Sequence, residues 1–141
     1  MPKRVSPQEA AELMTAGWTY LDVRSIPEFG QGHPTGAANV PLMHAEGGRM
    51  VANSDFQKVV LANFPRDTKL VVGCKSGGRS MRAVGVLAAL GYENLADVRG
   101  GFSGESDNMG RSTAVGWAET ALPVATQPEP GRSYADLQKK T

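Results

Sequence analysis

A strand, a short loop and a helix follow one another between residues 70 and 90, and this unit constrains the fold more than any other stretch. Leu70-Val71-Val72 is a continuous apolar run, which indicates a strand buried on both faces. The segment MRAVGVLAAL, from Met81 to Leu90, predicts a helix with Ser80 at its start. A tight loop must therefore join the end of a central strand to the beginning of a helix.

That loop, Cys74-Lys75-Ser76-Gly77-Gly78-Arg79-Ser80, has the composition of an anion site. Its two glycines permit left-handed backbone angles, which would turn amide N–H groups inward. These amides and the positive end of the helix favour negative charge, so we expect Cys74 to ionise more readily than an ordinary thiol. Lys75 and Arg79 add positive charge. The alternative is a small buried apolar side chain at a strand end, and the combination of glycines, cations and strand-loop-helix context favours a nucleophile.

Composition limits the partners. The 141 residues fit one domain, and 15 basic against 14 acidic residues give a net charge of +1. Such a balance gives no general attraction to nucleic acid or to an anionic membrane. The first residues lack the apolar core of a signal peptide, and the longest apolar run, Ala83 to Leu90, is too short to span a bilayer, so we expect a cytoplasmic protein.

A single cysteine limits the chemistry. Cys74 has no second thiol for an internal disulfide, a CxxC redox pair or a cysteine-rich metal site. Any group that Cys74 acquires covalently must therefore leave to another molecule.

The other elements are predicted from capping residues and apolar spacing. We expect a helix over residues 6–16, a strand over residues 18–23 with Asp22 and Arg24 at its exit, and a helical turn from Pro27. Residues 42–53 are interpreted as an irregular connection. A helix from Ser54 or Asp55 to Asn63 and a strand over residues 95–98 complete the pattern. Strands alternating with helices predict a mainly parallel sheet covered by helices on both faces, with ligands at the carboxyl ends of the strands.

Past Phe102 the pattern weakens. Residues 103–116 are polar and rich in glycine, which predicts a long surface loop. We place the domain at residues 1–126. The tail, residues 127–141, is expected to be partly disordered or docked through one turn at residues 133–137.

Taken together, these segments resemble the rhodanese family of sulfurtransferases in its single-domain form, from about Val5 to Val124. The ordered series of motifs is more specific than any one of them. It comprises Leu21-Asp22-Val23-Arg24, Glu28-Phe29, the stretch from Gly32 to Pro41, the loop from Cys74 to Ser80, and Val98-Arg99-Gly100-Gly101-Phe102. Two departures stand out: Gly32-His33-Pro34-Thr35-Gly36 replaces Gly-His-Ile-Pro-Gly, and the link from Phe102 to Trp117 is longer than usual.

The resemblance implies a five-stranded, mainly parallel sheet and transfer of a sulfane sulfur. Cys74 would take the outer sulfur of a small anionic donor such as thiosulfate and carry it as a persulfide to cyanide or a thiol, including a protein thiol. No metal or organic cofactor is needed. The residues expected to bind the substrate are Lys75, Ser76, Gly77, Gly78, Arg79 and Ser80.

Individual roles are open at this point. Lys75 either faces the donor or is solvated at the loop shoulder. Arg79 either binds the anion or pairs with Glu28 or Asp22 and braces the loop, and we favour bracing. Asp22 and Arg24 are expected to support the site as a structural pair rather than to react. His33 and His44 receive no catalytic role.

Other functions compete with sulfur transfer by an enzyme. A cysteine phosphatase or an arsenate reductase also surrounds an anion with a cysteine and an arginine. Phosphatases resemble Cys-x5-Arg, however, whereas this chain has one residue fewer between Cys74 and Arg79. A persulfide carrier and a rhodanese-like binding module, each serving a partner protein, are also compatible with the sequence. The expected oligomeric state is a monomer or a weak dimer.

Overall fold

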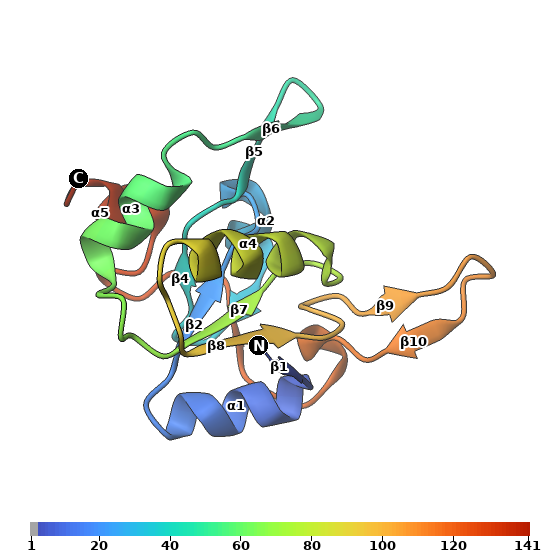
Figure 1. The fold of residues 1–141 in the computed structure, drawn as a ribbon. Coiled ribbons are helices and arrows are strands. Elements are labelled where there is room, and N and C mark those ends of the chain that lie inside the picture. The colour runs from blue at the N-terminus through green and yellow to red at the C-terminus, as the bar shows by residue number, and fades with distance from the viewer. Residues whose placement is uncertain (1–2) are drawn as a thin grey trace.

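The computed structural model describes residues 3–141, and its centre is a five-stranded parallel sheet (Figure 1). The strand order is β1-β8-β7-β2-β4, and every neighbouring pair runs parallel. The strands are β1 (Lys3–Val5), β8 (Leu95–Val98), β7 (Leu70–Gly73), β2 (Thr19–Asp22) and β4 (Ala38–Asn39). This topology confirms the predicted fold class.

Helices cover both faces of the sheet (Figure 1). On one face, α3 (Phe56–Asn63), α4 (Gly78–Ala89) and α5 (Tyr134–Gln138) pack their apolar side chains against Leu21, Leu70 and Val72. On the other face, α1 (Pro7–Thr15) and the 3-10 helix η1 (Trp117–Glu119) enclose a second core that contains Tyr20, Val71 and Val98. All four residues of β7 are buried because this strand lies in the middle of the sheet.

Two helices begin with the same device. Ser6 caps α1 and Ser25 caps α2 (Ile26–Gln31), and in each case the carboxylate of a glutamate three residues later accepts from the backbone N–H of the serine. Proline in the first turn of both helices fits their missing backbone donors. In α3, by contrast, Asp55 occupies the cap position without a side-chain bond.

Three segments differ from the sequence predictions. The predicted irregular connection over residues 42–53 is wrong, because β5 (Met43–Glu46) and β6 (Arg49–Ala52) form an antiparallel hairpin. Gly47 and Gly48 at its turn have φ values of 57° and 76°, as the tight turn of such a hairpin requires. The predicted loop over residues 103–116 also contains a hairpin, β9 (Glu105–Ser106) and β10 (Ser112–Ala114), which projects from the body (Figure 1). The third, β1, was absent from the predicted elements.

Two further antiparallel strands join distant parts of the chain. They are β3 (His33–Pro34) and β11 (Val124–Ala125), and they connect the loop after α2 to the segment after η1. Downstream, the backbone N–H of Asn39 donates to the Arg132 carbonyl, and Tyr134 and Leu137 of α5 are buried. Residues 132–137 therefore contribute to the core. Within residues 3–141, no helix combines the length and the apolar character that a membrane crossing needs.

Candidate active site

Cys74 follows the last residue of β7, at the carboxyl edge of the sheet, and its side chain is almost fully buried. The backbone N–H of Gly77 donates to Cys74 Sγ at 3.1 Å. Gly77 has φ +125°, a conformation that side-chain-bearing residues rarely adopt, and it is the residue before α4. The positive end of α4 and one aimed amide therefore meet the sulfur, as the loop composition predicts.

The helix begins earlier than predicted. It starts at Gly78 rather than at Ser80, and Gly78 takes ordinary helical angles. Only one of the two loop glycines therefore provides the left-handed turn. The N–H groups of Gly78, Arg79 and Ser80 belong to the first helical turn, where backbone donors have no partner within the helix.

Ser80 contacts the sulfur through its side chain. Its hydroxyl oxygen lies 3.5 Å from Cys74 Sγ and 3.1 Å from the Gly77 carbonyl oxygen, and it forms a hydrogen bond with Asp97 Oδ1. Ser80 is one of the residues predicted to bind the substrate, but a contact of its hydroxyl with the sulfur was not predicted. The hydroxyl could have been inferred, because the first turn of a helix places residue 80 back toward the loop that precedes it.

Arg79 forms a two-pronged ion pair with Glu28. Its Nη1 and Nη2 lie 2.6 and 2.9 Å from the two carboxylate oxygens. The hydrogen bond from Arg79 lowers the pKa of Glu28 to about 2, with help from Ser25 and against the effect of burial. Glu28 in turn raises the pKa of Arg79. Of the two carboxylates considered as partners of Arg79, Glu28 and Asp22, the structure therefore pairs Arg79 with Glu28.

Asp22 and Arg24 form a second, fully enclosed pair. Arg24 Nη2 donates to Asp22 Oδ2 and to the Gly32 carbonyl oxygen, both at 2.7 Å. The guanidinium carbon lies 4.4 Å from the centre of the Phe102 ring. Burial opposes the charge of Arg24, but the hydrogen bond and charge of Asp22 outweigh it and raise the pKa of Arg24. Asp22 and Arg24 therefore form the predicted structural pair, and their role in supporting the site stays a prediction.

Lys75 and Ser76 are exposed at the shoulder of the loop. Lys75 lines a cavity of about 260 Å³ together with residues of the two ion pairs and the segment after β8. Those other residues are Arg24, Glu28, Gln31, Gly32, Phe102 and Ser103. A larger cavity of about 520 Å³ lies between β1, α1 and β10, and no residue of the Cys74 loop lines it. The small cavity is therefore the better candidate for a ligand of Cys74, and the role of Lys75 stays a prediction.

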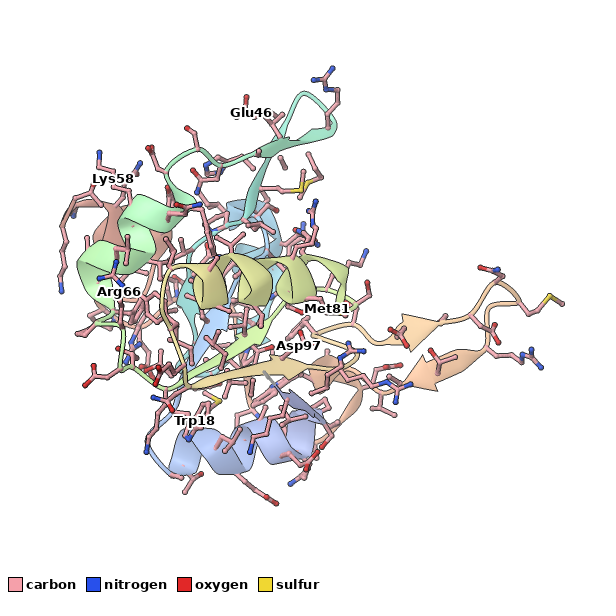
Figure 2. The ribbon with its side chains drawn as sticks, in the orientation of Figure 1. Trp18, Glu46, Lys58, Arg66, Met81 and Asp97 are labelled. Atoms are coloured by element: carbon pink, nitrogen blue, oxygen red, sulfur yellow. The ribbon has the colours of Figure 1, made fainter. Side chains whose placement is uncertain are left out.

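Several residues near the sulfur were not predicted. Asp97 lies at 3% exposure in β8, between that strand and α4 (Figure 2), and Arg4 of β1 donates to it at 2.7 Å. A charged residue inside the apolar strand sequence Leu-Ala-Asp-Val was the available signal. Tyr20 is also buried beneath the site, which raises its pKa well above the usual range, and its hydroxyl occupies the place where a Cβ at Gly73 would lie. Nothing in the sequence marked Tyr20.

The remaining histidine and metal predictions concern other parts of the chain. His33 is buried, stacks on the Phe29 ring and has its Nδ1 2.7 Å from the Phe29 carbonyl oxygen, a structural environment. His44 lies in β5, edge-on to Tyr134. In residues 3–141, no three His, Cys, Asp or Glu side chains are grouped so as to hold a metal ion.

A single α/β domain with a buried thiol between the end of a central parallel strand and the start of a helix defines the class of protein. The family model described as the rhodanese-like domain matches residues 6–107. The chain therefore belongs to the rhodanese-like domain family.

Individual relatives extend this match. The chain is 39% identical over 124 residues to thiosulfate sulfurtransferase 16, chloroplastic, of Arabidopsis thaliana, covering 88% of this chain and 93% of the relative. It is 30% identical over 124 residues to thiosulfate sulfurtransferase GlpE of Haemophilus influenzae (strain PittEE), covering 88% and 95%. A crystal structure of Rv0390 from M. tuberculosis superposes with a TM-score of 0.74 at 25% identity and covers 89% of this chain and 98% of that one. The predicted cytoplasmic location stays a prediction.

Proposed function

We propose that this protein is a sulfurtransferase that moves a sulfane sulfur from thiosulfate or a similar anionic donor to cyanide or a thiol. The observation that carries the proposal is the position of Cys74 Sγ, 3.1 Å from the Gly77 amide and at the positive end of α4. Two relatives with the name thiosulfate sulfurtransferase, matched over nearly their whole length, support the same reaction class.

The proposed reaction has two displacement steps. The Cys74 thiolate attacks the outer sulfur of thiosulfate, a new S–S bond forms, and the bond to the sulfonate sulfur breaks as sulfite leaves with the electron pair. The product is a Cys74 persulfide, whose outer sulfur carries the negative charge. The acceptor, cyanide or a thiolate, then attacks this outer sulfur and releases the Cys74 thiolate.

Each step in this scheme places negative charge on sulfur near the loop. The Gly77 amide and the first-turn amides of α4 can stabilise that charge, because they are fixed donors that need no rearrangement. The two ion pairs hold the surrounding wall in place. Since Cys74 is the only cysteine, the acceptor must be a second molecule, which includes the possibility of a partner protein thiol.

The test is intact-protein mass spectrometry after incubation with thiosulfate. We expect a mass increase of one sulfur atom, its removal by cyanide or dithiothreitol, and no increase in Cys74→Ser. A folded Cys74→Ser protein that transfers sulfur as fast as the wild type would sink the proposal. An oxygen-sized increase in the wild type would instead indicate oxidation of the thiol.

The arrangement gives less support to a phosphatase or an arsenate reductase. In a Cys-x5-Arg loop the arginine fork is available for the oxyanion, whereas here both prongs of Arg79 are bound by Glu28. The loop also has one residue fewer. Hydrolysis of an aryl phosphate at a rate comparable to sulfur transfer would favour a phosphatase, and we expect none above the Cys74→Ser background.

A further inference from the structure

A chain of polar contacts runs from the edge of the sheet to the sulfur. Arg4 Nε on β1 donates to Asp97 Oδ2 on β8, and Asp97 Oδ1 contacts the Ser80 hydroxyl on α4. Ser80 Oγ in turn lies 3.5 Å from Cys74 Sγ. Asp97 and Ser80 are both buried, while the Arg4 side chain is 38% exposed. Cys74 and Ser80 belong to the same loop and helix start, whereas Asp97 on β8 and Arg4 on β1 reach them only through the pairing of strands in the sheet.

The Ser80 hydroxyl has one hydrogen and three acceptors within reach. These acceptors are Asp97 Oδ1, the Gly77 carbonyl oxygen and Cys74 Sγ. A carboxylate is the strongest of the three for as long as the sulfur is protonated, so the hydrogen points to Asp97 and the thiol donates to the Ser80 oxygen. When the sulfur loses its proton, the same hydrogen can rotate to the thiolate. The ease of that rotation depends on how firmly Asp97 retains the hydrogen.

Arg4 is paired with the carboxylate that retains the hydrogen. Its guanidinium neutralises part of the Asp97 charge and therefore weakens the carboxylate as an acceptor. The guanidinium also borders the loop itself, since a Cβ added at Gly77 would lie 3.2 Å from Arg4 Nη2. Both effects act on the same sulfur.

We propose that Asp97 and Arg4 are positioning residues that set, through the Ser80 hydroxyl hydrogen, how readily the Cys74 thiol becomes a thiolate. Asp97 opposes ionisation and Arg4 relieves that opposition. The inference depends on the proposed function only in taking Cys74 as the reacting group.

Other charged groups surround the sulfur and are left unchanged by the test. Arg79 is close enough for its charge and that of Cys74 to influence one another, and Tyr20 is a neutral phenol because burial raises its pKa well above the usual range. Asp22 and Arg24 follow on β2 and its exit, Lys75 is the next residue along the chain, and Glu28 holds Arg79. Because these groups stay in place, a difference between variants at Arg4 or Asp97 reports on the Arg4-Asp97 pair.

The experiment is a pH titration of the thiolate ultraviolet absorbance, with Cys74→Ser as the blank. It needs no sulfur donor, so it can succeed or fail independently of sulfur transfer. Arg4→Gln should raise the midpoint by about one pH unit, and Asp97→Asn should lower it by a similar amount. A structural role would reduce thermal stability in both variants without moving the midpoint in opposite directions.

The Ser80→Ala background tests whether the hydroxyl transmits the effect. There we expect the two shifts to fall to less than about half, because only the through-space charge effect remains. Shifts of undiminished size in the Ser80→Ala background would overturn the role of the hydroxyl. If the two substitutions, made in the protein that retains Ser80, left the midpoint unchanged or moved it in the same direction, the whole inference would be overturned.

A matched control and a conservative variant complete the design. Arg99→Gln removes the same charge from a largely exposed side chain and should leave the midpoint unchanged. If Asp97→Asn does not fold, Arg4→Gln and Arg4→Lys decide the matter, because the lysine should restore most of the wild-type midpoint. A lysine variant that behaves like the glutamine variant would contradict a role for the charge.

Discussion

Glu28 makes three kinds of contact with its two carboxylate oxygens. It accepts hydrogen bonds from the Ser25 backbone N–H at the start of α2, from the Ser25 hydroxyl, and from both terminal nitrogens of Arg79. A helix cap and the active-site loop therefore share one residue, and the geometry of the loop depends on the first turn of α2. This sharing explains why the pKa of Glu28 is far below its ordinary value.

For the single residue Glu28 we predict a pH-dependent loss of stability in Glu28→Gln. The pKa of Glu28 falls from 4.5 to about 2 on folding, so its stabilising effect is complete above pH 4.5 and is lost as the pH falls toward 2. Because the ion pair is partly exposed, solvent reduces its contribution, and the free energy of unfolding of the variant should be lower by about 1–3 kcal/mol at neutral pH. Chemical denaturation at several pH values measures this difference, which should disappear near pH 2.

Arg79→Met provides the partner arm of a double-mutant cycle. If the Arg79-Glu28 pair braces the loop, the double variant should lose less stability than the two single variants together. Additive losses would mean that the two side chains act independently, and the bracing interpretation would then be withdrawn.

At the scale of elements, the active site depends on how β7 passes into α4. Gly77 supplies a backbone angle that its neighbours do not need, and it aims its own amide at the sulfur. On the other side of the loop, Phe102 N–H donates to the Cys74 carbonyl at 2.7 Å and Ser103 N–H to the Lys75 carbonyl at 2.8 Å. The loop is therefore held by the helix that follows it and by the segment that follows β8.

Gly77→Ala should impair both stability and sulfur transfer. An alanine at φ +125° costs about 1–2 kcal/mol, and its Cβ would also press on Arg4. The matched control is Gly85→Ala in α4, the helix that Gly77 precedes, where a Cβ meets nothing within 4 Å. There alanine should raise the free energy of unfolding by about 0.5–1 kcal/mol. Thermal melts and thiosulfate turnover of both variants test the pair, and equal behaviour of the two would contradict the importance of the turn.

The sequence-based prediction missed strands that are too short to show an alternating pattern of apolar residues. β7, β8 and α4 were found because their apolar runs are buried by the sheet and its helices. β9 has two residues and β10 three, which is too short for an alternating pattern. The β5-β6 hairpin did carry a signal, a Gly-Gly pair between two four-residue runs, and that turn chemistry was overlooked.

In the candidate site, too, some residues could be predicted from the sequence and others could not. Residues that are adjacent in sequence, such as those of the Cys74 loop, could be assigned together from the loop alone. Arg4 and Asp97 could not, because their meeting depends on the parallel pairing of β1 with β8 at residues 93 positions apart. A long-range contact of this kind requires the strand order, which local patterns do not contain.

At the scale of the whole molecule, the last residues close the core over α3. Tyr134 and Leu137 are buried among the side chains that face α3 and α4, and Tyr134 Oη accepts from Asn53 Nδ2 at 3.1 Å. Asn63 adds a hydrogen bond to the Leu137 carbonyl at 2.8 Å. The C-terminal segment therefore packs as part of the same layer as the preceding helices.

Removal of residues 127–141 should destabilise the domain. The truncation exposes the core beneath Tyr134 and Leu137, and burial of each large apolar side chain contributes roughly 1.5–3 kcal/mol. We therefore expect the free energy of unfolding to fall by about 2–5 kcal/mol. Removal of residues 139–141 alone is the control, since their side chains are exposed, and should have little effect. Urea denaturation compares the two, and a chain ending at residue 126 with wild-type stability would show that the tail is an independent appendage.

The β9-β10 hairpin has a base that packs against the body of the domain and an arm that projects from it (Figure 1). Trp117 N–H donates to the Gly101 carbonyl, Ala118 N–H donates to the Phe102 carbonyl, and a Cβ at Gly116 would collide with the backbone of residues 102–104. Both ends of the arm thus leave from one rigid point beside the Cys74 loop. Evolution could lengthen, shorten or replace residues 106–112 without disturbing the sulfur, because residues 113–115 belong to the base, where they pack against Gly100 and line a cavity with Arg4. We therefore expect residues 106–112 to diverge fastest among close homologues while the glycines at the base persist.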